Sequence, residues 1–290
     1  MSNTSQAILL AFAATALFAI AAALAKVAVQ EFHFLQILFV RQVIVLLSAL
    51  PTLVRTFPAS LKTGHPLTHG LRLLAAFTAL SSGIWAVEVL PLTTAITLAF
   101  AQIFFTALLA SKFLNEPVGP QRLITILVGF IGVVIVMRPT VDGMLNIHAV
   151  IPVAGAFGAA IAVVCVRKLS QSESTATLLA YQSVFVGLIA ALPLPWVWVT
   201  PTALELSLLI AIGVISTAAQ WIGVKALRLG EASVIGNVEY MKLIYAALIG
   251  YFVFSEIPDR YTIIGAAIII ASSAHIIHRE TRQKAQAKHA

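Results

Sequence analysis

Apolar residues along this chain form long stretches instead of alternating with polar residues. Charged residues, proline or glycine separate the stretches, and most of them have roughly the 20 residues that a helix needs to cross a bilayer. The pattern predicts ten membrane-spanning helices, over residues 7–29, 34–53, 71–89, 92–113, 122–138, 148–167, 176–195, 203–225, 232–254 and 261–278. Because the stretches lack the two-residue alternation of a membrane barrel, the predicted fold class is an all-α integral membrane protein.

The composition supports this fold class and excludes a soluble enzyme. Hydrophobic residues make up 60% of the 290 residues and charged residues only 10%. Soluble domains carry about 25% charged residues, so this chain has too little polar sequence to cover a water-facing surface. The single cysteine, Cys165, excludes an intrachain disulfide and a cysteine-based metal site. The basic residues behind the net charge of +7 are scattered, which favours membrane topology over nucleic-acid binding.

Lysine and arginine residues are distributed unequally between the two sides of the predicted bundle. One side holds thirteen of the 18, namely Arg55, Lys62, Arg72, Lys112, Arg122, Arg167, Lys168, Lys225, Arg228, Arg279, Arg282, Lys284 and Lys288. The other side holds Lys26, Arg138 and Arg260, while Arg41 and Lys242 lie within spans. Because basic connections face the cytoplasm, the split predicts that both termini are cytoplasmic and that the number of spans is even.

The chain also repeats itself at about half its length. Residues 108–116 read LLASKFLNE and residues 248–256 read LIGYFVFSE, so that Glu116 matches Glu256 at a shift of 140. With five spans in each half, the second copy enters the membrane from the opposite side. We therefore predict two inverted five-helix repeats, residues 1–140 and residues 141–290 with a basic cytoplasmic tail, an organisation typical of carriers that alternate access around a central site.

The same segments resemble a known family. Residues 71–139 contain the element LPLTTA before span four and the element FLNE before span five, and residues 227–259 repeat this organisation. Together they are similar to the EamA-type family of the drug/metabolite transporter superfamily, and within it to a subgroup that includes S-adenosylmethionine carriers. The resemblance covers nearly the whole chain. It implies ten helices in two inverted repeats around a central cavity, and transport of small metabolites, chiefly amino acids and their derivatives.

Span nine carries the most informative candidate residues for substrate binding. Glu239 and Lys242 lie three residues apart and so share a helix face, with Asn237 and Tyr240 beside them. An ionisable group within a membrane costs roughly 2.5–3.5 kcal/mol and by default indicates function. Glu239 either handles the solute or a proton directly, or forms a permanent ion pair with Lys242 that only fixes helix packing. A third option is that Lys242 extends to the membrane interface.

Aromatic and amide side chains on three other spans extend this candidate site. Trp85 lies in span three, Gln102 in span four and Trp221 in span eight. Aromatic walls with a few amides suit an organic solute that has an apolar part or a positive charge. The family resemblance places spans three, four, eight and nine around the cavity, and we therefore group these three residues with span nine.

These observations predict a secondary transporter of small organic metabolites, amino acids or their derivatives, that exports them across the cell inner membrane by alternating access. The alternatives are an uptake carrier or exchanger for cationic metabolites such as S-adenosylmethionine, and a channel or lipid scramblase. No GxxxxGK[ST] loop, GxSxG element or HExxH pair is present, so we expect no enzyme, cofactor or metal. The expected partners are the solute and the bilayer. Proton coupling and the choice between monomer and homodimer stay open.

Overall fold

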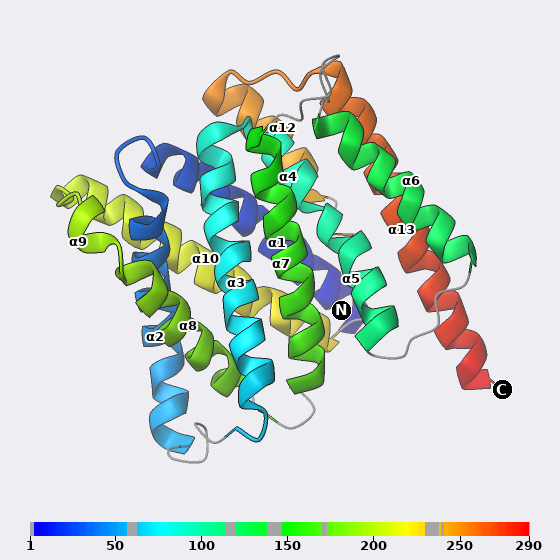
Figure 1. Ribbon diagram of the computed structural model, residues 1–290, viewed down its shortest axis with the longest axis horizontal. Coiled ribbons are helices and arrows are strands. Elements are labelled where there is room, and N and C mark those ends of the chain that lie inside the picture. Colours follow the sequence, from blue (N-terminus) through cyan, green and yellow to red (C-terminus); the bar gives the residue numbers. More distant parts are fainter. Residues whose placement is uncertain are drawn as a thin grey trace.

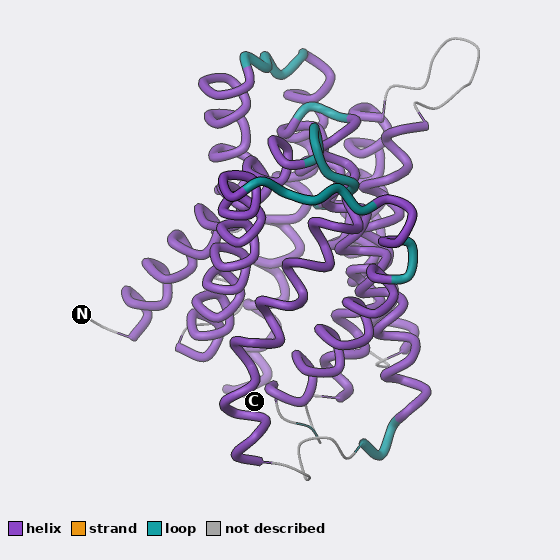
Figure 2. Tube along the Cα trace, turned by 90° about the vertical axis from the view of Figure 1, so that its left-hand side faces the viewer, coloured by secondary structure: helices purple, strands orange, loops and turns teal. Residues whose placement is uncertain are grey.

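The computed structural model describes residues 3–56, 63–113, 120–137, 147–169, 173, 175–229, 238 and 241–289, and within these ranges every regular element is a helix (Figure 1). Figure 2 shows that the helices pack into one bundle, with most of the described loops in the upper half of the view. The helices are α1 Asn3–Ala28, α2 Phe34–Thr56, α3 Pro66–Val89, α4 Leu92–Ala99, α5 Ala101–Phe113, α6 Pro120–Met137, α7 Ile147–Leu169, α8 Thr175–Ala191, α9 Leu194–Val197, α10 Ala203–Leu229, α12 Met241–Phe254 and α13 Arg260–His289.

Several of these helices have the length and composition of membrane spans. Among the described residues, five helices are long and apolar enough to cross a bilayer, at Gln6–Ala28, Phe34–Pro51, Pro66–Val89, Ile147–Val166 and Ala203–Gly223. Shorter apolar stretches lie at Leu92–Thr106, Ile124–Met137, Thr177–Ala191, Met241–Phe254 and Arg260–Ser272. Each stretch overlaps one predicted span. The all-helical architecture and the apolar helices fit a membrane protein, as the sequence predicts.

Small residues allow the helices to approach closely. Helix α3 packs along α7, α1 along α10, α2 along α8 and α6 along α13. At Gly158 of α7, an added Cβ atom would lie only 2.8 Å from the carbonyl oxygen of Ala75 on α3. At Gly265 of α13, it would lie 2.7 Å from the carbonyl oxygen of Gly132 on α6. Backbone thus meets backbone at both pairs, as in other membrane helices with small residues at their contacts.

The predicted span over residues 92–113 is divided in the structure into α4 and α5. Phe100 lies between them with φ −64° and ψ −15°, and its N–H donates to the carbonyl oxygen of Thr97. The hydrogen bond therefore spans three residues instead of four, which tightens the chain locally without reversing it. Ala95, Ala99 and Gln102 keep the three-to-four-residue spacing of one helix face across this point.

A glutamine clamp closes the bundle at the end where α1 meets α2. The side chain of Gln36 at the start of α2 is fully buried. Its Nε2 donates to the carbonyl oxygen of Val199 at 2.7 Å, and its Oε1 accepts from the N–H of Val199 at 3.0 Å. This two-way amide pair fixes the segment after α9 to α2, and it satisfies backbone groups in a segment without regular structure.

Candidate functional site

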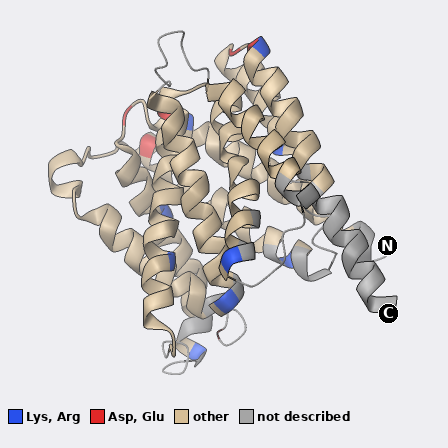
Figure 3. Cartoon of the chain, turned by 45° about the vertical axis from the view of Figure 1, so that its right-hand side comes forward, with Lys and Arg blue, Asp and Glu red and all other residues tan. Residues whose placement is uncertain are grey.

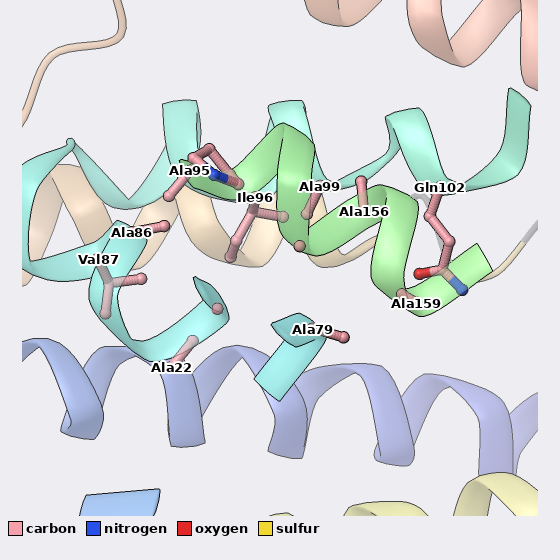
Figure 4. A pocket seen from close by; sticks show the side chains of 13 residues that line it. Ala22, Ala79, Ala86, Val87, Ala95, Ile96, Ala99, Gln102, Ala156 and Ala159 are labelled. Atoms are coloured by element: carbon pink, nitrogen blue, oxygen red, sulfur yellow. The ribbon is translucent and has the colours of Figure 1, made fainter. Parts of the chain in front are cut away.

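A cavity of about 190 Å³ lies among α1, α3, α4, α5 and α7 (Figure 4). Alanine and glycine make up most of its wall, so the helix backbones largely define its shape. In Figure 4, Ala86, Val87 and Ala95 line one end, and Gln102 and Ala159 lie toward the other. The complete set of described lining residues is Ala22, Ala79, Gly83, Ala86, Val87, Ala95, Ile96, Ala99, Gln102, Pro152, Gly155, Ala156 and Ala159.

Gln102 is the polar side chain of this lining set. The α4–α5 segment positions it two residues past Phe100, on the same face as Ala95 and Ala99. Its carboxamide offers two N–H donors and a carbonyl acceptor to whatever enters the cavity. An apolar wall with one amide can accept a mainly apolar molecule and fix its orientation.

The two predicted tryptophans occupy other places in the bundle. The ring of Trp85 stacks on Phe34 of α2, with centroids 5.4 Å apart and planes inclined by 6°, and 41% of the residue is exposed. Trp221 of α10 is 42% exposed, and its Nε1 donates to Oγ of Ser48 on α2 at 3.5 Å. The lining set of this cavity includes neither residue, so their part in binding stays a prediction.

The predicted span-nine group falls largely outside the described residues. Asn237, Glu239 and Tyr240 belong to that undescribed part. Lys242 is described in the first turn of α12, and its Nζ lies 5.1 Å from the centroid of the Phe18 ring on α1. A cation over an aromatic face is a favourable contact. The pairing of Glu239 with Lys242 therefore stays a prediction.

Lys26 and Glu256 form a charged pair that the sequence pattern does not predict, and we call this pair with its hydrogen bonds the Lys26–Glu256 clasp. Nζ of Lys26 on α1 lies 2.8 Å from Oε1 of Glu256, which follows α12, and the two side chains are 14% and 18% exposed. Nζ also donates to the carbonyl oxygens of Val87 and Leu90 at the end of α3. Oε2 of Glu256 accepts from the N–H of Leu92, the first residue of α4, at 2.8 Å. The clasp thereby satisfies free groups at two helix ends.

A second charged contact lies near the start of α3. His69 Nε2 and Glu173 Oε2 are 2.6 Å apart, with side chains 3% and 5% exposed, and Thr63 Oγ1 donates to Glu173 Oε1 at 2.6 Å. Burial raises the pKa of the Glu173 carboxyl, but the hydrogen bonds from Thr63 and His69 outweigh this effect and lower the pKa below its usual 4.5. The contact ties α3 to the connection between α7 and α8.

Arg72 is buried, although the sequence analysis counts it among the basic connections. It lies in α3 and is 2% exposed. Its Nη2 donates to the carbonyl oxygen of Leu178 at 3.1 Å and to Oε1 of Gln182 at 3.2 Å, both on α8. These acceptors hold the guanidinium group between α3 and α8, because a buried cation requires hydrogen-bonding partners.

The several apolar helices, packed around a cavity, define the class as multi-pass membrane proteins. The model of the EamA-like transporter family matches residues 5–138 and again residues 147–277. The chain belongs to this family, and the resemblance noted in the sequence is confirmed. Its family and the relatives below are transporters rather than enzymes.

The similar proteins carry small metabolites. The S-adenosylmethionine uptake transporter of Rickettsia bellii is 31% identical over 250 residues, covering 86% of each chain. The riboflavin transporter of Vibrio cholerae is 32% identical over 229 residues, covering 77% of this chain and 76% of its own. A crystal structure with 18% identity superposes with a TM-score of 0.62, covering 93% of this chain and 96% of the other, and shares the fold.

Proposed function

We propose that this transporter is a secondary carrier of organic metabolites, and that its solute crosses the membrane through the cavity among α1, α3, α4, α5 and α7. The observation that carries this proposal is a cavity between the helices of a transporter-family fold, whose described lining contains one polar side chain, Gln102. Relatives that cover most of the chain are named for S-adenosylmethionine and for riboflavin. Both solutes combine a flat heteroaromatic ring with polar groups. The Gln102 carboxamide could pair with the edge of such a ring while the alanine wall contacts its face.

The size of the cavity supports alternating access. Pockets for drug-sized ligands occupy about 300–1,000 Å³, whereas this cavity measures about 190 Å³. A metabolite with a bicyclic or tricyclic ring therefore needs a wider cavity than this conformation offers. Helix movement that widens the cavity and opens one end is the change that alternating access requires.

The helix pairing supports two inverted repeats over residues 1–140 and 141–290. The family model matches once within each half. Suppose that α1 corresponds to α7 and that α3 corresponds to α10. Exchanging the two halves then converts the helix pair α1–α10 into the pair α7–α3, and the structure contains both pairs. The pairs α2–α8 and α6–α13 each map onto themselves, as an approximate two-fold axis between the repeats requires.

The orientation of the chain completes the proposed topology. We propose ten spans with both termini in the cytoplasm, in the cell inner membrane. In Figure 3 the visible acidic segments lie toward one end of the bundle and most visible basic segments toward the other. The basic end then faces the cytoplasm. In this orientation the Lys26–Glu256 clasp lies on the outer side.

The direction of transport and the remaining site residues are further parts of the proposal. The sequence predicts export of amino-acid metabolites, with uptake of S-adenosylmethionine-like solutes as the alternative. The name of the Rickettsia bellii relative favours testing uptake or exchange first. Glu239 with Lys242 stays our candidate for solute or proton handling on span nine. Trp85 and Trp221 stay our candidates for aromatic contacts with the solute, which would form in another conformation.

The test is solute flux in proteoliposomes that contain a pH-sensitive dye. We expect S-adenosylmethionine, riboflavin or an aromatic amino acid to exchange against its labelled form, and Gln102→Leu to change the order of preference among them. Gln30→Leu, at an exposed position between α1 and α2, serves as the matched control. Flux equal to that of protein-free liposomes for every solute would refute the proposal, and an unchanged preference in Gln102→Leu would remove this cavity from the path.

A further inference from the structure

The Lys26–Glu256 clasp lies next to one end of the cavity. Three of the elements that it joins, α1, α3 and α4, also contribute residues to the cavity wall. Ala22 lies four residues before Lys26 on α1, and Ala95 lies three residues after Leu92 on α4. Val87 contributes to the cavity wall and its carbonyl oxygen accepts from Lys26. The clasp therefore holds together the helix ends that border this end of the cavity.

The clasp also connects the two matched segments of the chain. Lys26 and the α3–α4 turn belong to residues 5–138, whereas Glu256 belongs to residues 147–277. Movement of one repeat against the other therefore changes the distance between the two charges. Two hydrogen bonds from Lys26 and one to Glu256 involve backbone groups, so the clasp fixes helix ends and not only side chains.

The backbone around Glu256 is held in an unusual conformation. Ser255 has a φ of 54°, in the left-handed region that residues other than glycine rarely adopt. The N–H of Glu256 then donates to the carbonyl oxygen of Gly250 at 2.8 Å. A Cβ atom on Gly250 would lie 3.3 Å from Oε2 of Glu256, so the carboxylate lies against bare backbone. Strained residues of this kind cluster at ligand clamps and switch regions.

We propose that Lys26 and Glu256 form a gate that holds this end of the cavity closed, and that the cavity opens toward this end only when the pair separates. The proposal rests on the cavity being the transport path. The two side chains are 14% and 18% exposed, so the pair is largely buried. Because the desolvation of two buried charges offsets much of their attraction, the pair has a modest net stability and can break and reform during each cycle.

The gate is tested by cysteine accessibility, which needs no substrate. The native thiol is removed by Cys165→Ala, and a reporter thiol is placed by Ala95→Cys near the clasp or by Ala159→Cys near the other end of the cavity. Protein in nanodiscs is labelled with a membrane-impermeant maleimide, and the rate is compared with and without Glu256→Gln or Lys26→Met.

We expect each gate variant to raise the labelling rate of the thiol at position 95 about tenfold, which corresponds to about 1.4 kcal/mol. The rate at position 159 should not rise. The double variant should label no faster than the faster single variant, because residues that act as one pair give non-additive effects. The matched control is Glu205→Gln, since within the described part of the chain the Glu205 carboxylate accepts from the neighbouring Thr202 and joins no second helix.

Three results would overturn the gate. They are an unchanged labelling rate at position 95, a double variant whose rate increase is the product of the two single increases, and equal increases at positions 95 and 159. The last would indicate general loosening of the bundle, and gel filtration of each variant checks for it independently. The proposed function fails separately, through absence of flux in the wild type. Flux without a labelling change would refute the gate but not the proposed function. A labelling change without flux would refute the proposed carrier function but not the pairing of Lys26 with Glu256.

Discussion

Gly83 on α3 offers a direct way to fill the cavity without disturbing the fold. It lines the cavity, and a Cβ atom built on it meets nothing within 4 Å. Gly70 on the same helix has the same open surroundings but lies outside the lining set. Leucine at position 83 therefore enters the proposed path, whereas leucine at position 70 is the matched control.

The expected stability change follows from the surroundings of Gly83. Replacing a helical glycine by alanine gains about 0.8–1.0 kcal/mol of helix propensity, and no contact opposes it here. Leucine adds the packing of up to three further carbons against an apolar wall, at about 0.8 kcal/mol each, so that Gly83→Leu stabilises the protein by at most about 3 kcal/mol. Transport should nevertheless be abolished, because the cavity of about 190 Å³ is already smaller than a metabolite requires.

The assay combines unfolding by SDS in mixed micelles with flux in proteoliposomes. We expect Gly83→Leu to unfold at the same or a higher SDS fraction than the wild type and to carry no solute, whereas Gly70→Leu keeps full flux. Normal flux in a well-folded Gly83→Leu protein would refute the path through this cavity. A loss of stability would refute the local geometry from which the argument starts.

Three further predictions concern contacts between elements. Gly158→Ala should destabilise the protein by about 1–3 kcal/mol relative to Gly70→Ala in the same SDS titration, because the added Cβ meets a backbone oxygen at 2.8 Å. The lowered pKa of Glu173 stabilises the fold above about pH 4.5, and this contribution is lost as the pH falls through the folded-state value. Melting temperatures between pH 6 and pH 3 should therefore fall more steeply in the wild type than in Glu173→Gln. Gln36→Leu should accelerate hydrogen exchange at the amide of Val199, which loses its acceptor, and unchanged exchange would contradict the clamp.

The positions of the helices follow from the sequence because bilayer thickness sets the length of an apolar span. The exceptions have local causes. Helix α3 begins at Pro66, before the apolar stretch, because proline at the first helical position loses no hydrogen bond there. The interruption at Phe100 has no glycine or proline to announce it, so the predicted span over residues 92–113 is continuous.

The candidate site could be predicted only in part. Gln102 is recognisable as an amide within a span, and the structure places it in the cavity wall. The clasp is not recognisable, since Lys26 and Glu256 lie 230 residues apart and three of the four contacts that they make in it involve backbone groups at helix ends. Counting basic residues along the sequence places Arg72 in a connection, because it cannot detect an acceptor on another helix such as the Leu178 carbonyl oxygen.

The alanine and glycine wall of the cavity has a consequence for how a substrate is selected. Such residues have no side-chain rotamers, so binding orders almost no protein side chains and the loss of conformational entropy that opposes binding is small. Adaptation of the wall to a solute then occurs through helix positions, or over evolution through the gain of single methyl groups. Replacing one of these alanines by valine would change the shape of the cavity directly. A scaffold of this kind can acquire new cargoes in small steps while its helix contacts elsewhere stay unchanged.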